Sequence, residues 1–160
     1  LWSDHGMHLG EKQQWEKFTL FEEATRVPLI VVAPGLTQPG SICDRPVSLL
    51  DIYPTLNELC RLPQRTDLDG VSLVPLLKNP TAKWERPAIT TWGRNNHAVR
   101  TQRYRYIRHP NGDEQLYDHR VDPDEFVNLA DESGRAAVKS RLSKWLPKLN
   151  SPAVVNTPSR

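Results

Sequence analysis

The sequence predicts an α/β piece of a sheet domain, followed by a small α+β subdomain. In the first half, residues 27–33 form a continuously apolar run, as in a strand buried on both faces, and residues 48–59 have the spacing of an amphipathic helix. After about Trp84, short strand-like runs precede one helix, which is typical of a small antiparallel sheet covered by a helix on one face. We therefore divide the chain into residues 1–84 and 85–160.

The first half begins with what resembles the end of a strand at Leu1 and Trp2. Residues 3–11 are predicted to form a loop, because Gly6 and Gly10 would both weaken a helix. A short helix is expected within 13–23. The helix over 48–59 tolerates Pro54 if this residue lies in the first turn. Residues 71–77 are expected to form one or two further helical turns.

The second half is predicted to contain four short strands and a final helix. The strands are expected over 87–92, 97–101, 103–108 and 114–118, and residues 109–113 form a strong hairpin-turn signal between the last two. Apolar residues at helical spacing indicate a helix over roughly 133–148. The acidic stretch 122–125 and Asn128 have the chemistry of turns and caps, and we assign them no catalytic role.

The third of these strands interleaves arginine with tyrosine, a pattern that also occurs in nucleic-acid-binding surfaces. Alternation places Tyr104 and Tyr106 on one face, and Arg103 and Arg105 on the other. The chain is 38% hydrophobic and 25% charged, and its 21 Lys and Arg nearly balance its 19 Asp and Glu. This balance excludes a protein that mainly binds nucleic acid or an anionic membrane, and it favours a half-buried strand with a charged outer face.

The apolar run and the cysteines set further limits. The run over 27–34 is far shorter than the roughly 20 residues needed to cross a bilayer, so we expect no membrane span. Cys43 and Cys60 match no zinc-binding spacing. They form either one disulfide or two buried thiols, and we favour the thiols because free cysteine commonly behaves as a small core residue.

Asp4 and His5, just beyond a strand end, are the first candidates for chemistry. Ligands of open α/β sheets collect beyond the carboxyl ends of strands, and both side chains there could reach one cation. The plainer interpretation is a turn cap beside a surface histidine. A zinc cluster of His5, His8 and Glu11 is disfavoured because it needs a helix through the glycines. Lys17 either binds an anionic oxygen or is an ordinary solvated lysine.

Several segments together resemble the sulfatase family, and most closely its iduronate-2-sulfatase group. The resemblance is strongest over Ser3-Asp4-His5-Gly6-Met7-His8-Leu9-Gly10-Glu11-Lys12, followed by Trp15-Glu16-Lys17-Phe18-Thr19-Leu20-Phe21-Glu22 and by residues 25–30, and the first block is the specific one. Further matches follow in the same order at residues 51–56, 69–73, 115–118, 122–125 and 128–129. The resemblance implies an alkaline-phosphatase-like sheet domain followed by a C-terminal subdomain with a four-stranded antiparallel sheet and a helix.

The resemblance also implies chemistry. Sulfatases hydrolyse sulfate esters with a formylglycine nucleophile beside a calcium ion. Asp4 falls on a direct calcium ligand of the family, and carboxylate oxygen suits this hard cation. His5 falls beside the metal, as a peripheral ligand or a sulfate contact with a catalytic role. Lys17 falls on the family's sulfate-binding lysine, where its charge would neutralise ester oxygens or the leaving group.

Some family features are missing from the chain. Neither Cys43 nor Cys60 lies in the Cys/Ser-x-Pro-x-Arg motif that becomes formylglycine, and the family's paired N-terminal aspartates are absent. We therefore expect the C-terminal part of a sulfatase of sulfated small molecules or glycans, inactive as a 160-residue chain. A phosphonate or phosphate monoester hydrolase and a non-catalytic binding module are the alternatives. The family implies a periplasmic or secreted location, and the unpaired strand at 27–33 predicts self-association.

Overall fold

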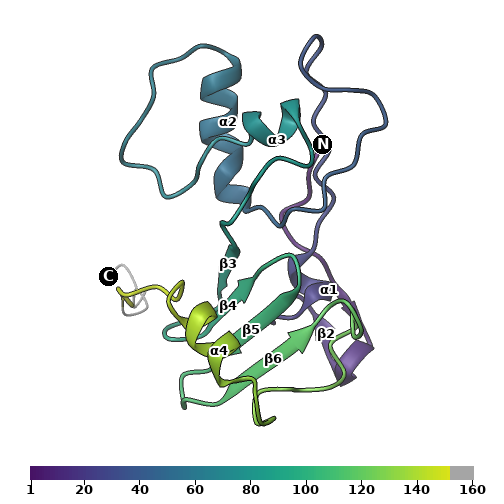
Figure 1. Cartoon of the computed structure of the whole chain (residues 1–160), viewed down its shortest axis with the longest axis vertical. Helices are drawn as coiled ribbons and strands as arrows, with labels where there is room; N and C mark the ends of the chain where they lie inside the picture. Colours follow the sequence, from purple (N-terminus) through teal and green to yellow (C-terminus); the bar gives the residue numbers. More distant parts are fainter. Residues whose placement is uncertain (152–160) are drawn as a thin grey trace, which may run out of the picture.

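The computed structural model describes residues 1–151, so the last nine residues of the predicted subdomain lie outside the described part. A four-stranded antiparallel sheet with strand order β3-β4-β5-β6 forms the lower part of the molecule in Figure 1. The strands are β3 (Ala88–Thr91), β4 (His97–Arg100), β5 (Tyr104–Arg108) and β6 (Glu114–Asp118). All four predicted strands are confirmed, as is the predicted turn, which His109 closes by donating its backbone N–H to Asp113 O at 2.9 Å.

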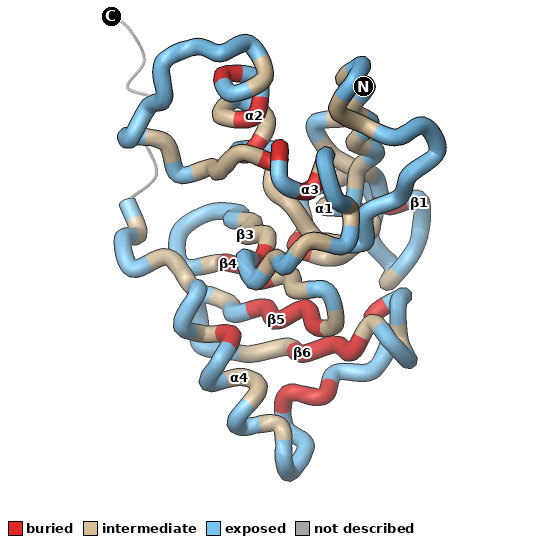
Figure 2. Tube along the Cα trace, turned by 45° about the horizontal axis from the view of Figure 1, so that its top comes forward, coloured by how far each residue is buried: buried red, intermediate tan, exposed pale blue. Residues whose placement is uncertain are grey.

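One face of the sheet packs against helix α4 (Ala136–Ser143). Tyr104 and Tyr106 point to this face, as their alternation predicts, and Leu142 of α4 joins them in the core. Figure 2 shows that the buried chain is concentrated along β5 and β6. Helix α4 is shorter than the predicted 133–148, because turns rather than α-helix precede and follow it. The four strands and this helix confirm the predicted fold class.

The opposite face of the sheet is covered by the beginning of the chain. This segment contains β1 (His8–Leu9), the 3₁₀ turn η1 (Glu11–Gln13), β2 (Trp15–Glu16) and α1 (Glu22–Thr25). Leu20 and Phe21 pack against Ala98, Ile107 and Tyr117 of the sheet. The helix predicted over 13–23 is wrong. Positive φ angles at Gln13 and Glu16 prevent a helix there. Only the last two residues of the predicted range, Glu22 and Glu23, are α-helical, as the start of α1.

The helices predicted in the middle of the chain are confirmed. Ser48 and Asp51 form a capping box at η2 (Leu49–Asp51), which continues into α2 (Ile52–Leu59), with Pro54 in the first turn. Helix α3 (Val74–Lys78) packs on α2. Both lie above the sheet in Figure 1. Within residues 1–151, no helix is long and apolar enough to cross a membrane.

The strand predicted over 27–33 is not formed. The run stays extended, but its sole strand-type pairing among the described residues is an isolated antiparallel bridge between Trp2 and Leu29. Val32 is 81% exposed, so the expected burial on both faces is wrong. A strand buries its faces only when sheet neighbours flank it, and residues 1–151 supply one such contact. The favoured burial of Cys43 and Cys60 is also wrong, because both are free and exposed.

Candidate active site

The structure brings together the three residues that the sequence singles out. Lys17 Nζ lies 2.7 Å from His5 Nε2, and Asp4 Oδ2 lies 3.5 Å from the same nitrogen. Asp4 and His5 follow the bridge at Trp2, and Lys17 follows β2. His5 Nδ1 lies 2.7 Å from the Gly6 carbonyl, so this nitrogen carries the proton and donates it. His5 Nε2 therefore accepts a hydrogen bond from the Lys17 ammonium group.

A close backbone approach fixes the loop that carries Asp4 and His5. The Gly6 backbone N–H donates to the Ala24 carbonyl at 2.9 Å, and Ser3 N–H donates to the Pro28 carbonyl at 3.3 Å. A Cβ at position 6 would lie 1.9 Å from the Glu23 carbonyl oxygen, so glycine is required there. The loop is therefore held against α1, and its charged side chains face outward beside Lys17.

The three side chains differ in their fitness to hold calcium. The Asp4 side chain is 82% exposed, and its carboxylate suits a hard cation. His5 does not fit a metal ligand in this arrangement, because Nδ1 donates to the Gly6 carbonyl and Nε2 accepts a hydrogen bond from Lys17. Within residues 1–151, Asp4 is thus a single candidate ligand at this place. Calcium requires more oxygen ligands than this segment supplies.

The disfavoured zinc cluster of His5, His8 and Glu11 is not assembled. His8 is fully buried, and its Nε2 lies 2.7 Å from Thr19 Oγ1. Glu11 instead accepts a hydrogen bond from the Leu9 backbone N–H, which lowers the pKa of its carboxyl. His8 therefore anchors the residue two positions after Lys17 rather than a metal.

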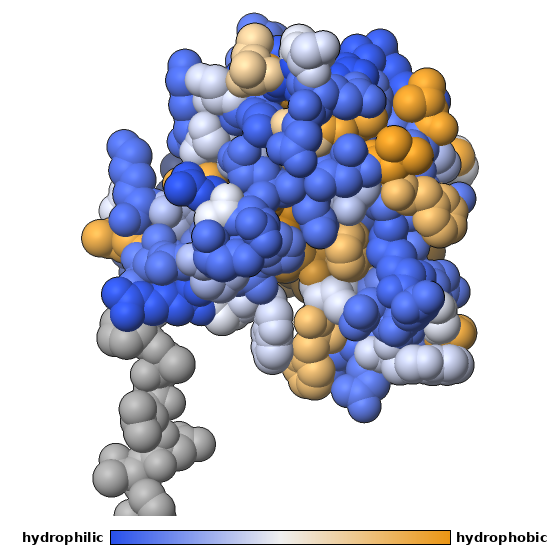
Figure 3. All heavy atoms as spheres, turned by 90° about the horizontal axis from the view of Figure 1, so that it is seen from below, coloured by the Kyte–Doolittle hydropathy of each residue, from blue (hydrophilic) through white to orange (hydrophobic). Residues whose placement is uncertain are grey.

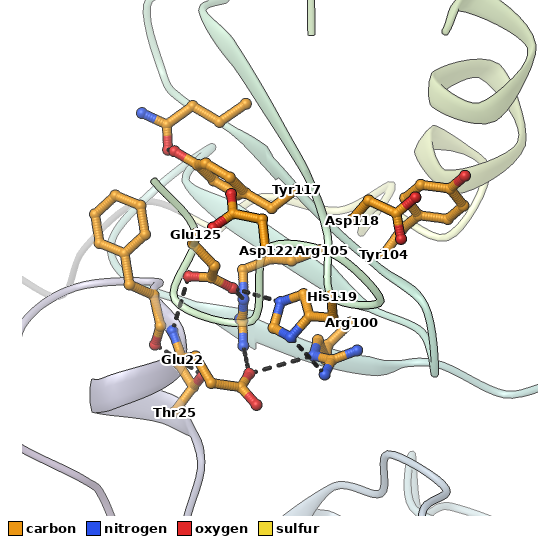
Figure 4. A network of polar contacts seen from close by, with 12 residues as sticks. Glu22, Thr25, Arg100, Tyr104, Arg105, Tyr117, Asp118, His119, Asp122 and Glu125 are labelled. Carbon is orange, nitrogen blue, oxygen red and sulfur yellow. Dashed lines mark hydrogen bonds and ion pairs between the residues drawn. The ribbon is translucent and has the colours of Figure 1, made fainter. Parts of the chain in front are cut away.

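An ionic network around the buried Arg105 borders the same depression as Asp4, His5 and Lys17. The sequence predicted a charged outer face of β5 at this place. Figure 4 shows Arg105 between Glu22 of α1 and Glu125 of the turn after β6. The Arg105 side chain is 1% exposed and forms ion pairs with both carboxylates. Its Nη1 donates to the Leu20 carbonyl at 2.9 Å. The expectation for Arg105 is wrong because these partners cover it, whereas Arg103 pairs with Asp118 at 2.6 Å at the sheet edge.

Two further side chains complete the network. Arg100 Nε donates to Glu22 at 3.2 Å, and its Nη2 lies 2.8 Å from His119 Nδ1. His119 Nε2 lies 2.8 Å from Glu125 Oε1. Glu22, His119 and Glu125 are close enough to share a cation. Two guanidinium groups already contact these carboxylates, so the group is an ion-pair network rather than a metal site.

The network changes the acidity of both carboxyl groups. Burial acts to raise the pKa of Glu22, but the charges of Arg105 and Arg100 outweigh it, and the pKa lies below its ordinary value. For Glu125, burial again acts upward, and the hydrogen bond with His119 and the charge of Arg105 lower the pKa. Both groups are therefore held as carboxylates.

The network fixes the segment that carries Lys17 from the C-terminal side. Glu125 accepts a hydrogen bond from the Glu22 backbone N–H at 3.0 Å, and its carbonyl accepts one from Lys12 Nζ. The Lys12 ammonium also lies 4.9 to 5.4 Å from the ring centroids of Phe21, Tyr117 and Phe126. Sequence reasoning missed Glu125. A signal was available: Arg105 lies between two tyrosines in the middle of a strand, and an arginine that is buried there needs an acidic partner.

The open side of the site is a broad depression. Asp4, His5 and Lys17 line it together with Phe18 and with Trp92 at the end of β3. Lysine and arginine outnumber aspartate and glutamate among the lining residues. The arrangement combines an ammonium group, a histidine that contacts it, and an exposed carboxylate. Such a set suits the recognition of an anionic ester.

The chain is similar to known proteins in both sequence and structure. Residues 10–152 match the family described as N-sulphoglucosamine sulphohydrolase, C-terminal. A sulfatase of Formosa agariphila is 42% identical over 151 residues, covering 94% of this chain and 30% of the relative. Arylsulfatase K of Gallus gallus is 34% identical over 143 residues, which cover 80% of this chain and 26% of the relative. The chain belongs to the sulfatase family.

Solved structures agree with this assignment. A protein bound to its substrate D-glucosamine-2-N,6-O-disulfate matches with a TM-score of 0.74 and 27% identity, covering 89% of this chain and 32% of that one. The phosphonate monoester hydrolase of Agrobacterium radiobacter matches with a TM-score of 0.77 and 26% identity. The match covers 89% of this chain and 32% of the hydrolase. The chain thus spans less than a third of the length of these relatives.

Proposed function

We propose that this chain forms the C-terminal part of an enzyme that hydrolyses sulfate esters, and that it supplies the sulfate-binding lysine. The observation that supports this most directly is the contact of Lys17 with His5, with Asp4 beside them, at the edge of an open, basic depression. By the resemblance of residues 3–18 to the family, these three residues are the ones we expect to bind metal and sulfate. Family membership supports sulfate ester hydrolysis, and the roles of the individual residues are our inference.

In this proposal each side chain has one task. Lys17 binds a sulfate oxygen or the ester oxygen through its ammonium group and offsets the charge that develops there. His5, with Nδ1–H fixed on the Gly6 carbonyl, presents Nε2 to Lys17 and so sets the position of the ammonium group. Asp4 is available as a calcium ligand. When bound, calcium and formylglycine would supply charge neutralisation and the nucleophile, with the other ligands coming from outside this chain.

A sulfated sugar is the substrate class we favour. One similar structure holds a sulfated glucosamine, and the matching family is described as a sulphoglucosamine sulphohydrolase, C-terminal. The finer likeness to the iduronate-2-sulfatase group stays a prediction. The relatives found include arylsulfatase K and choline-sulfatase. We also expect a periplasmic or secreted enzyme, which cell fractionation tests.

The second candidate is a phosphonate monoester hydrolase, favoured by the similar Agrobacterium radiobacter enzyme. The two activities differ in the substrate that gives the larger kcat/KM. We expect the full-length protein to prefer a sulfate ester over the matching phosphonate monoester. A preference for the phosphonate would replace our proposal with this alternative. Absence of turnover for both substrates would favour a binding module.

The test of the site uses the full-length protein with Lys17→Ala and Asp4→Ala. We expect either substitution to lower kcat/KM for a sulfate ester by about 10²- to 10³-fold, the usual effect of removing one charge-stabilising group. Lys83→Ala, an exposed lysine paired with Glu85, is the control and leaves activity unchanged. Full activity of the Lys17 variant would contradict the assignment.

A further inference from the structure

Two aromatic rings from distant parts of the chain stack on each other at the surface. Phe18 follows β2, and Trp92 follows β3. Their ring centroids are 4.6 Å apart, and the ring planes form an angle of 25°. Phe18 is 52% exposed and Trp92 is 48% exposed. Each ring thus contacts the other while about half of its surface stays open to solvent.

Both rings are held by ordered backbone. The Trp92 N–H donates to the Asn96 carbonyl at 3.0 Å, within the tight turn that joins β3 to β4. Next to Phe18, the Thr19 N–H donates to the Lys17 carbonyl at 2.8 Å, and Thr19 Oγ1 contacts the buried His8. The exposed pair is therefore fixed by its neighbours, and it forms a preorganised apolar surface.

The pair lies next to the proposed sulfate site. Both rings line the same depression as Asp4, His5 and Lys17. The Lys17 ammonium lies 5.8 Å from the centroid of the Phe18 ring. An ester whose sulfate contacts Lys17 must extend its organic group away from the ammonium. A six-membered sugar ring joined to that sulfate reaches over this distance to the aromatic pair.

We propose that Phe18 and Trp92 form a platform that binds the sugar ring of the sulfated substrate. This inference rests on the function proposed above and adds the residues that contact the organic group. The C–H face of a pyranose is apolar and packs on aromatic rings, whereas its hydroxyl groups stay in water. The excess of lysine and arginine around the depression favours an anionic sugar over an apolar protein partner.

The experiment uses the full-length enzyme with Trp92→Ala and Phe18→Ala. The probes are D-glucosamine-2-N,6-O-disulfate as substrate and inorganic sulfate as competitive inhibitor. We expect each variant to raise the KM of the sugar about tenfold and to leave sulfate inhibition within about twofold of the parent. Trp92→Phe keeps a stacking ring and should restore most of the affinity. Trp15→Ala, an exposed tryptophan of the same segment outside the depression, should change neither value.

Several results would overturn the platform. One is an unchanged KM in both alanine variants, and another is weaker sulfate inhibition in parallel with the higher KM. If Trp92→Ala does not fold, Phe18→Leu provides the same test with a smaller change. Failure of the proposed function gives a different pattern. In that case Lys17→Ala leaves sulfate inhibition unchanged, whatever the aromatic variants show.

Discussion

Replacing Arg105 by methionine tests whether the buried network stabilises the protein. The substitution keeps an unbranched apolar stem but removes the guanidinium group, whose three nitrogens donate to Glu125, the Leu20 carbonyl and Glu22. Removing one partner of a buried ion pair costs about 3–5 kcal/mol. Arg100 still contacts Glu22, and His119 still contacts Glu125, so we expect the lower end of this range, about 3 kcal/mol.

The measurement is thermal and urea unfolding of the parent and variant proteins. For a folded unit of this size, a loss of about 3 kcal/mol corresponds to a Tm lower by about 6–12 °C. Arg108→Met is the matched control, because Arg108 lies on the same strand and is exposed. The control should change the unfolding free energy by less than about 0.5 kcal/mol.

A double substitution separates the ion pair from general packing. Glu125→Gln removes a charge that Arg105→Met would leave buried without its main partner. The two substitutions together should therefore cost less than the sum of the separate costs. A loss below about 1 kcal/mol for Arg105→Met, or strict additivity in the double variant, would refute the reasoning.

Two further predictions concern the pH dependence of stability and the steric room at two glycines. Folding lowers the pKa values of Glu22 and Glu125. Their contribution to the free energy of unfolding is therefore complete above pH 4.5, the ordinary pKa of a glutamate, and is lost as the pH falls through the lowered pKa values. Unfolding measured from pH 7 to 3 should show the difference between parent and Arg105→Met shrinking; a constant difference would contradict this. Gly70→Ala places a Cβ 2.0 Å from the Leu50 carbonyl oxygen and should cost more than about 2 kcal/mol in urea unfolding. Gly112→Ala meets no atom within 4 Å and should cost only about 1 kcal/mol; equal losses would refute the steric argument.

The C-terminal sheet could be predicted from the sequence because its signals are local. Alternation along β5 and the turn after it fix the strand pairing between neighbours in the chain. The run over 27–33 carried an equally strong signal, but its burial depends on strands that residues 1–151 do not provide. Local pattern alone could not show this.

The site was predictable in part. A motif placed Asp4, His5 and Lys17, and the structure brings them together without testing their roles. The contacts of Glu125 that fix the segment with Lys17 were not predicted, because the residues around Glu125 have the pattern of a turn. Its partners lie 20 and 103 positions away, at Arg105 and Glu22, and no short-range pattern reports such contacts.

The distance along the chain between the two sides of the network has a consequence for synthesis. Glu22 leaves the ribosome 103 residues before Glu125. At about 5–20 residues per second, the segment with Lys17 waits about 5–20 seconds for its last anchor. Leu20 and Phe21 lack the sheet that covers them until Tyr117 has been made. A messenger truncated just before the codon for Glu125 would thus yield a chain that contains Asp4, His5 and Lys17 without the support that Glu125 gives to the segment with Lys17.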